Sequence, residues 1–304
     1  MDLIVRNGTI ITGDQLFQGD IGVRNGKIVA VGEVSGTAAQ EIDAEGMLVF
    51  PGLIDPHVHF KLPVRDVFSS DDFMTGSRAA LLGGITTYLD FTNQPLGKPL
   101  AGSLRERLDE VKENSYSDFG LHALINDWPA GYENEIEHMI SSGVTSFKFF
   151  MYSRGQGEKC DDGTLYRLLR ACGERALVIL HAENGSLINH FTEEQVSSGR
   201  LDVVGHALAR PAMVEEEAVE RAVFWAGKSG GMIMILHLST AGAASIIKKA
   251  RQRGIKVMAE TCPQYLVLDE SMYGKENAYL HATCPPVRTA SDREGLWDAI
   301  AGGD

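Results

Sequence analysis

The chain is poor in cysteine: its 304 residues include only four, and no two of them form a C-x-x-C pair. Wide spacing of this kind is typical of free thiols in a reducing compartment and argues against a disulfide framework. Apolar runs are also short, because none approaches the roughly 18 residues that a membrane-spanning helix needs. The N-terminus lacks the basic segment and long apolar stretch of a secretory signal. We therefore expect a cytoplasmic protein without a membrane partner.

Positive charge is outweighed by negative charge. Lysine and arginine total 28 against 41 aspartates and glutamates, which gives a formal net charge of -13 at pH 7. This excess argues against nucleic acid or an anionic membrane as a partner. Hydrophobic residues make up 44% of the chain, which is typical of a globular protein with a full core.

The first 50 residues differ from the rest because they show no helical period. Two Val-Arg-Asn-Gly segments start 18 residues apart, at Val5 and Val23. An Asn-Gly pair between apolar runs predicts a hairpin turn. We expect residues 1–50 to form a small antiparallel, sandwich-like β domain that is incomplete and too thin to bury a core alone.

Apolar strands alternate with amphipathic helices from residue 48 onward. The strand-like runs are Leu48–His59, Ile85–Thr92, Gly120–Asn126, Ser146–Tyr152, Ala176–Ala182, Met232–Leu238 and Lys256–Thr261. Near-continuous apolar strands are typical of a parallel sheet that is buried on both faces. Strand–helix units in series predict an α/β fold, a TIM-like (β/α)8 barrel over residues 51–304. A doubly wound sheet is the alternative, weakened by the lack of a glycine-rich phosphate loop after the first strand.

An eighth barrel strand is not visible in the sequence. A barrel that lacks one strand would expose two raw sheet edges, which is implausible for a stable soluble protein. We therefore expect that the chain is truncated before strand eight, or that something else closes the barrel.

Ionisable residues stand at the ends of these apolar runs, where barrel enzymes place their active sites. His57 and His59 lie two residues apart, and residues i and i+2 of a strand face the same side. Imidazole is the commonest metal-ligating side chain. Three later runs carry Lys148, His181 and His237. Because unpaired ionisable groups in apolar surroundings are costly, the set predicts a metal centre.

Lys148 is the most diagnostic of these residues. Phenylalanines on both sides predict burial, which lowers the pKa of an ammonium group. A neutral amine can react with carbon dioxide to give a carbamate, an anion whose two oxygens can bridge two metal ions. The alternative is a lysine paired with a buried carboxylate such as Asp90 or Glu183.

The chain resembles the cyclic amidohydrolases, in particular the dihydropyrimidinase and hydantoinase branch, over essentially all 304 residues. The segments that carry the resemblance are Pro51–His59, Asp71–Ala80, Gly84–Phe91, Ser146–Tyr152, His181–Asn184, His237–Ser239 and Glu260–Leu266. The resemblance implies two zinc ions, one bound by His57 and His59 and the other by His181 and His237. Carboxylated Lys148 would bridge the two.

The resemblance also implies a reaction. A hydroxide between the metals would open a hydantoin or dihydropyrimidine ring to an N-carbamoyl amino acid, and Tyr152 would donate to the developing oxyanion. The protein would be a homotetramer acting on a small cyclic amide. An aspartate that completes the metal site, and an asparagine that holds the ring, are expected beyond residue 304.

Substrate contacts depart from the family pattern at one position. Cys284 stands where the family usually has serine, at a point where the ring is contacted mainly through backbone groups. By resemblance, the loop after His59 lines the pocket, where Leu62, Val64 and Phe68 would favour an apolar ring substituent. Packing of these loop residues on each other is the alternative.

Two other functions remain open at this stage. An allantoinase or dihydroorotase of the same superfamily ranks lower, because Lys61–Arg65 departs from the loop pattern of those enzymes. A non-catalytic scaffold homologue is disfavoured because all five visible metal ligands are present. Zinc content would separate an enzyme from a scaffold.

Overall fold

A computed structural model describes residues 1–64, 67–152, 158 and 160–303. The chain forms two compact units. One comprises Met1–Asp90 and Asn114–Gly120, and the other comprises Phe91–Glu113 and Leu121–Asp304.

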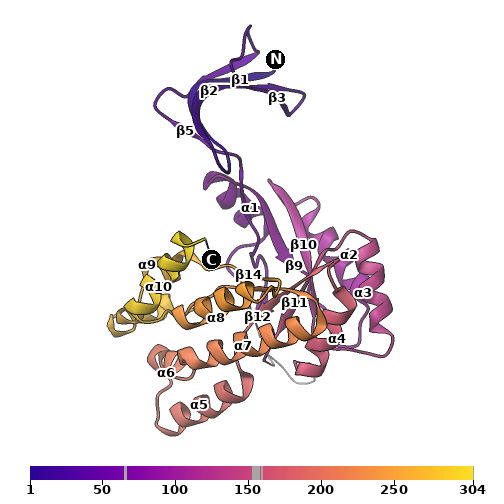
Figure 1. The fold of residues 1–304 in the computed structure, drawn as a ribbon, viewed down its shortest axis with the longest axis vertical. Coiled ribbons are helices and arrows are strands. Elements are labelled where there is room, and N and C mark those ends of the chain that lie inside the picture. Colours follow the sequence, from indigo (N-terminus) through magenta and orange to yellow (C-terminus); the bar gives the residue numbers. More distant parts are fainter. Residues whose placement is uncertain (65–66, 153–157, 159, 304) are drawn as a thin grey trace. The chain divides into compact units, whose positions relative to one another are not determined.

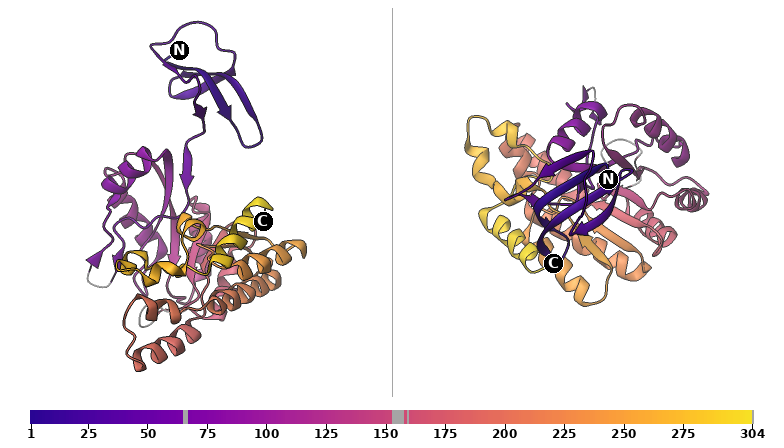
Figure 2. Two further views of the ribbon diagram at one scale, coloured as in Figure 1. Left: turned by 90° about the vertical axis from the view of Figure 1, so that its left-hand side faces the viewer. Right: turned by 90° about the horizontal axis from the view of Figure 1, so that it is seen from above.

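A five-stranded sheet occupies the N-terminal segment (indigo in Figure 2). Its strands are β1 (Leu3–Ile11), β2 (Leu16–Arg24), β3 (Lys27–Gly32), β4 (Gln40–Asp43) and β5 (Leu48–Val49). Strands β1, β2 and β3 pair antiparallel, as predicted. The expectation of a wholly antiparallel unit is wrong, because β4 and β5 both pair with β1 in parallel.

Only one of the two Asn-Gly pairs in residues 1–50 makes a hairpin. Asn25 and Gly26 have φ values of 53° and 70°, as the two-residue turn between β2 and β3 requires. Asn7 also has a positive φ, 60°, but β1 continues through it with a bulge between Val5 and Gly8. The hairpin predicted there is wrong, because the backbone N–H of Asn7 donates to Asp20 Oδ1 of the neighbouring strand at 2.9 Å.

Parallel strands make up the main sheet. They are β6 (Leu53–Asp55), β9 (Ile85–Phe91), β10 (Asp118–Ile125), β11 (Ser146–Phe150), β12 (Leu177–His181), β13 (Met232–Ile235) and β14 (Val257–Ala259). Their hydrogen-bonding order, β14-β13-β12-β11-β10-β9-β6, follows the chain without reversal. A doubly wound sheet would reverse its strand order at a switch point. The predicted α/β fold of the barrel class is therefore confirmed.

The first predicted barrel strand, Leu48–His59, is divided between the two sheets. Its start is β5, which pairs with β1, and its middle is β6, which pairs with β9. Pro51 and Gly52 separate the two pieces, since proline lacks the N–H that a ladder needs. A Cβ on Gly52 would lie 2.1 Å from Thr86 Oγ1, so the chain passes too close to β9 for any larger residue.

The connections are mostly helical (Figure 1). The helices and the short hairpin are α1 (Phe73–Leu82), α2 (Leu100–Val111), α3 (Tyr132–Ser141), α4 (Asp162–Cys172), α5 (Gly185–Ser197), α6 (Val203–Leu208), α7 (Ala212–Ser229), α8 (Ala241–Gln252), α9 (Pro263–Val267), η1 (Glu270–Gly274), η2 (Ala278–His281), α10 (Ala290–Ala301), β7 (Pro63–Val64) and β8 (Val67–Phe68). None of the described helices is both long and apolar enough to cross a membrane.

Local chemistry explains where the helices begin and which faces they bury. The side chains of Asp72 and Asp161 cap α1 and α4, because each accepts a backbone N–H group of the first helical turn. Helix α7 buries a stripe that includes Val214, Ala218 and Ala222. It packs on β13, while α4 packs on β12 and α8 on β14. These helices thus cover β12 and β13, the strands that lead to His181 and His237.

Candidate active site

His57 and His59 lie in the first unit, just beyond the end of β6 at Asp55. Their Nε2 atoms are 3.2 Å apart and their rings are edge to face. Although β6 ends earlier than predicted, Val58 N–H still donates to Leu89 O at 3.0 Å, which continues the strand pairing past Asp55. This contact keeps the two imidazoles on one side of the chain, as strand alternation requires.

Hydrogen bonds fix the backbone around the two histidines. His57 N–H donates to Asp55 Oδ1 at 3.1 Å, and Phe60 N–H donates to Asp90 Oδ2 at 3.3 Å. Asp90 is buried, so its carboxylate supports the loop as a hydrogen-bond acceptor. Ser69 Oγ closes the far side by donating to His59 O at 2.9 Å. The loop is thereby held on both sides.

The loop predicted to line the substrate pocket is a short hairpin. Strands β7 and β8 pair Pro63 with Phe68, and Leu62 N–H donates to Ser69 Oγ at 2.9 Å. Leu62 is half-buried, whereas Phe68 is 63% exposed. Val64 belongs to β7, and its side chain lies outside the described part.

Lys148 lies in the second unit, on β11, and is only 1% exposed. Its Nζ is 4.5 Å from the centroid of the Phe150 ring and 5.3 Å from that of Phe91. The carboxyl group of Glu260, at the end of β14, interacts electrostatically with Lys148, and burial raises the pKa of that carboxyl. Glu260 opens the sequence segment Glu260–Leu266, but nothing in the sequence pointed to a role for its side chain.

His181 ends β12, and His237 follows β13. The register sets Lys148 beside Ile179 and Phe150 beside His181, so Lys148 and His181 lie on one face of the sheet. The rings of His181 and His237 are 4.4 Å apart, centroid to centroid. His237 has a φ of 37°, a left-handed conformation that is costly for histidine and typical of functional sites.

Tyr152 and Cys284 approach the same histidine. The Tyr152 ring lies edge-on to His181, with centroids 4.9 Å apart, and its hydroxyl is 3.9 Å from Cys284 Sγ. Burial raises the pKa of the Tyr152 phenol above its usual value, so the hydroxyl stays a proton donor at neutral pH. Burial also raises the pKa of the Cys284 thiol to about 11, and this protonated thiol is 3.7 Å from Glu183 Oε2.

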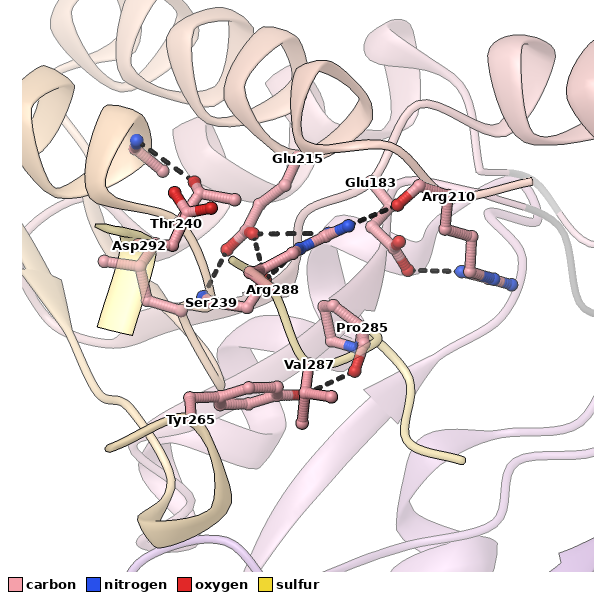
Figure 3. A network of polar contacts seen from close by, with 12 residues as sticks. Glu183, Arg210, Glu215, Ser239, Thr240, Tyr265, Pro285, Val287, Arg288 and Asp292 are labelled. Carbon is pink, nitrogen blue, oxygen red and sulfur yellow. Dashed lines mark hydrogen bonds and ion pairs between the residues drawn. The ribbon is translucent and has the colours of Figure 1, made fainter. Parts of the chain in front are cut away.

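A largely buried network of charged residues, which the sequence did not predict, includes Glu183, Arg210, Glu215 and Arg288 (Figure 3). Glu183 pairs with Arg210, and the main-chain carbonyl of Arg210 accepts a hydrogen bond from Arg288. Arg288 Nε donates to Ser239 Oγ at 2.9 Å, and its guanidinium lies 3.6 Å from Glu215. The signals available in the sequence were the glutamate two residues after His181 and the arginine of Pro-Pro-Val-Arg.

Within the described part of the chain, one group of three side chains has ligand atoms within 4.8 Å of one another: His181, Glu183 and Cys284. Glu183 Oε2 in this group already contacts both His181 Nε2 and the Arg210 guanidinium. The positive charge of the Arg210 guanidinium would repel a metal ion bound to the same carboxylate oxygen. The trio is therefore better described as a hydrogen-bonded cluster around His181.

Comparison with known proteins gives consistent matches over the whole chain. The amidohydrolase family model matches residues 48–303. A D-hydantoinase of Geobacillus stearothermophilus is 38% identical, over all of this chain and 65% of that protein. An allantoinase of Rubrobacter xylanophilus is 35% identical, over all of this chain and 66% of that protein. This chain thus spans about two thirds of the length of these relatives.

A solved structure shows the same similarity in three dimensions. The crystal structure of dihydropyrimidinase from Brevibacillus agri superimposes with a TM-score of 0.96 at 34% sequence identity. The match covers 100% of this chain and 67% of that one. The fold described above and the matched sequence therefore agree along the full length of the chain.

Proposed function

This chain belongs to the amidohydrolase family, and we propose that its protein opens a cyclic amide ring by hydrolysis. The substrate class is a hydantoin or a dihydropyrimidine, and the product is an N-carbamoyl amino acid. The observation that carries the proposal is Lys148, a nearly inaccessible lysine that shares a sheet face with His181. The hydantoinase and dihydropyrimidinase similarities support the substrate class.

The donor set fits two divalent metal ions, which we propose to be zinc. Zinc–nitrogen bonds of 2.0–2.1 Å at a tetrahedral angle separate two ligand nitrogens by about 3.3 Å. The Nε2 atoms of His57 and His59 are 3.2 Å apart, which matches that separation. His181 and His237 would hold the second ion, and Lys148, as its carbamate, would be shared. Such a metal pair supplies a hydroxide at neutral pH and polarises the substrate carbonyl.

The protein's own residues shape the reaction around this centre. Aromatic rings beside the buried Lys148 keep water away from its amine, which must be neutral to form a carbamate. The protonated Tyr152 hydroxyl can donate to the oxygen on which negative charge develops. Leu62, Val64 and Phe68 would favour an apolar substituent on the ring, and Cys284 would contact the ring mainly through its backbone.

Tyr152→Phe is expected to lower kcat by about 10²–10³-fold, the usual effect of losing an oxyanion donor. KM should change little, because the donated hydrogen bond strengthens as charge develops. Steady-state kinetics on a 5-substituted hydantoin measures both constants. The zinc content of the variant should equal that of wild type, and a kcat within twofold of wild type would remove Tyr152 from this role.

Cys284→Ser is expected to change kcat/KM by no more than about tenfold, which is the range of one neutral hydrogen bond. The reason is that the thiol is 3.9 Å from the Tyr152 hydroxyl and 3.7 Å from Glu183, so both contacts are weak. The same kinetic assay checks this. A loss beyond a hundredfold would show that the thiol itself acts on the substrate.

A substrate panel tests the proposed function. The intact protein, loaded with zinc in bicarbonate buffer, is assayed for ring opening of a 5-substituted hydantoin, dihydrouracil and allantoin. Turnover of hydantoin or dihydrouracil supports the proposal, and their rate ratio identifies the preferred ring. Allantoin alone would establish the second candidate, which the allantoinase relative favours. Absence of both turnover and zinc would establish a scaffold. We further propose that the protein is cytoplasmic and that it forms a homotetramer. Its molecular mass in solution tests the assembly.

A further inference from the structure

We infer that Glu183, held in place by Arg210, is a positioning residue that makes His181 present its Nδ1 atom to the metal. This inference rests on the function proposed above. It assigns a role to two residues that lie outside the proposed ligand set.

The geometry at His181 fixes which ring nitrogen carries the proton. His181 Nε2 is 2.6 Å from Glu183 Oε2, and the two side chains are 4% and 0% exposed. A ring nitrogen that faces a carboxylate at this distance is the one that donates its N–H. In neutral imidazole the other nitrogen then keeps its lone pair. Nδ1 is therefore the atom that His181 can offer to a metal ion, and the carboxylate makes that atom a stronger ligand.

Residues from other elements hold Glu183 itself. Arg210, in the loop between α6 and α7, forms an ion pair with Glu183 Oε2 (Figure 3). The main-chain carbonyl of Arg210 accepts a hydrogen bond from Arg288, and Arg288 is tied to Ser239 just beyond His237. The position of the carboxylate is therefore set by the loops that follow β12, β13 and α6, together with the segment before α10.

The same arginine also contacts the proposed oxyanion donor. The Arg210 guanidinium carbon is 5.2 Å from the centroid of the Tyr152 ring, within the range of a cation–π contact. Arg210 thus packs on Tyr152 and pairs with Glu183, and both of these contact His181. Arg210 therefore links the orientation of His181, a proposed metal ligand, to that of the Tyr152 hydroxyl, the proposed oxyanion donor.

Zinc titration tests the inference without relying on turnover. The intact wild-type protein and its variants are stripped of metal and titrated with zinc in bicarbonate buffer against a competing chelator. Glu183→Ala is expected to weaken one of the two zinc sites by about 10–100-fold, the usual effect of losing a carboxylate that orients a ligating histidine. Glu183→Gln should lose less than about tenfold, because its amide oxygen can still accept from Nε2–H. Glu137→Ala is the control, since Glu137 pairs with Arg175 at the surface and should leave both affinities unchanged.

The outcomes separate the inference from the proposed function. Two zinc ions bound to Glu183→Ala as tightly as to wild type would overturn the inference and leave the proposed function standing. No zinc bound by wild type would overturn the proposed function and the inference with it. If Glu183→Ala does not fold, Glu183→Gln and Glu183→Asp supply the test. The aspartate keeps the charge but retracts it from Nε2, so it should bind zinc more weakly than the glutamine variant; the reverse order contradicts the inference.

Discussion

Replacing Lys148 with alanine is expected to reduce ring opening by more than about 10³-fold and to reduce the zinc content. The loss should exceed the 10–100-fold effect of a residue that only orients a ligand, because the carbamate is proposed to hold both metal ions. Initial rates with a 5-substituted hydantoin and metal analysis of the same sample measure both effects.

A short carboxylic acid should restore part of the activity of Lys148→Ala. The truncation leaves a space beside Phe91 and Phe150, and acetate or propionate can supply a two-oxygen anion there. Lys148→Met is the matched control, since its side chain fills much of the space and offers no anionic oxygen. It should stay inactive with or without added acid.

A simpler role for Lys148 gives different results. If the ammonium serves only as the partner of Glu260, Lys148→Met should retain its zinc and its turnover when it is folded. The fold would lose stability instead, and Glu260→Gln in the same chain would restore it. That pattern would contradict the carbamate.

Arg288→Met is expected to lower the free energy of unfolding by about 3–5 kcal/mol, the usual cost of removing one partner of a buried ion pair. Arg288 is 7% exposed and faces Glu215, which is 1% exposed. The substitution also removes the donors to Ser239 Oγ and to the Arg210 carbonyl. Urea unfolding of the zinc-loaded protein measures the change.

The destabilisation should grow with pH. Burial raises the pKa of the Glu215 carboxyl from 4.5 to about 7, although Arg288 pulls it down. A carboxyl whose pKa is higher in the folded than in the unfolded protein stabilises the fold while it is protonated. For Glu215 this stabilisation is complete below pH 4.5 and is lost as the pH rises through about 7. Without Arg288 the folded pKa rises further, so the loss continues above pH 7. The gap between variant and wild type should then widen by up to about 1.4 kcal/mol per pH unit.

A partly exposed ion pair, without a buried carboxylate, provides the control for this prediction. Arg293 pairs with Asp269, with side chains 28% and 19% exposed. Arg293→Met should cost no more than about 1 kcal/mol, as is typical of surface pairs. Equal losses for Arg288→Met and Arg293→Met, at every pH, would show that the Glu215–Arg288 pair contributes no more than a surface bridge.

Much of the fold follows from patterns that are local in sequence. Apolar runs without alternation predicted the parallel strands of the main sheet. Predictions from local patterns were wrong where residues distant in the sequence determine the structure. Asn7 sits in a bulge because Asp20 binds it, and Leu48–His59 splits because β1 and β9 each pair with part of it.

The same distinction between local patterns and distant contacts applies to the candidate site. The sequence placed His57, His59, Lys148, His181 and His237 inside or just after apolar runs, and the structure has them in or next to the parallel strands. The pairing of Glu183 with Arg210, and of Glu215 with Arg288, was not predictable. These partners are far apart in sequence, and only the packing of α7 and its neighbouring loops onto the strand ends brings them together.

Metal analysis of the intact protein tests the central claim most directly. The protein is produced in zinc-supplemented medium, dialysed against metal-free buffer containing bicarbonate, and analysed for zinc by mass spectrometry. The account predicts about two zinc ions per chain. A zinc content near zero in correctly folded protein would contradict it, because the five proposed ligands would then hold no metal.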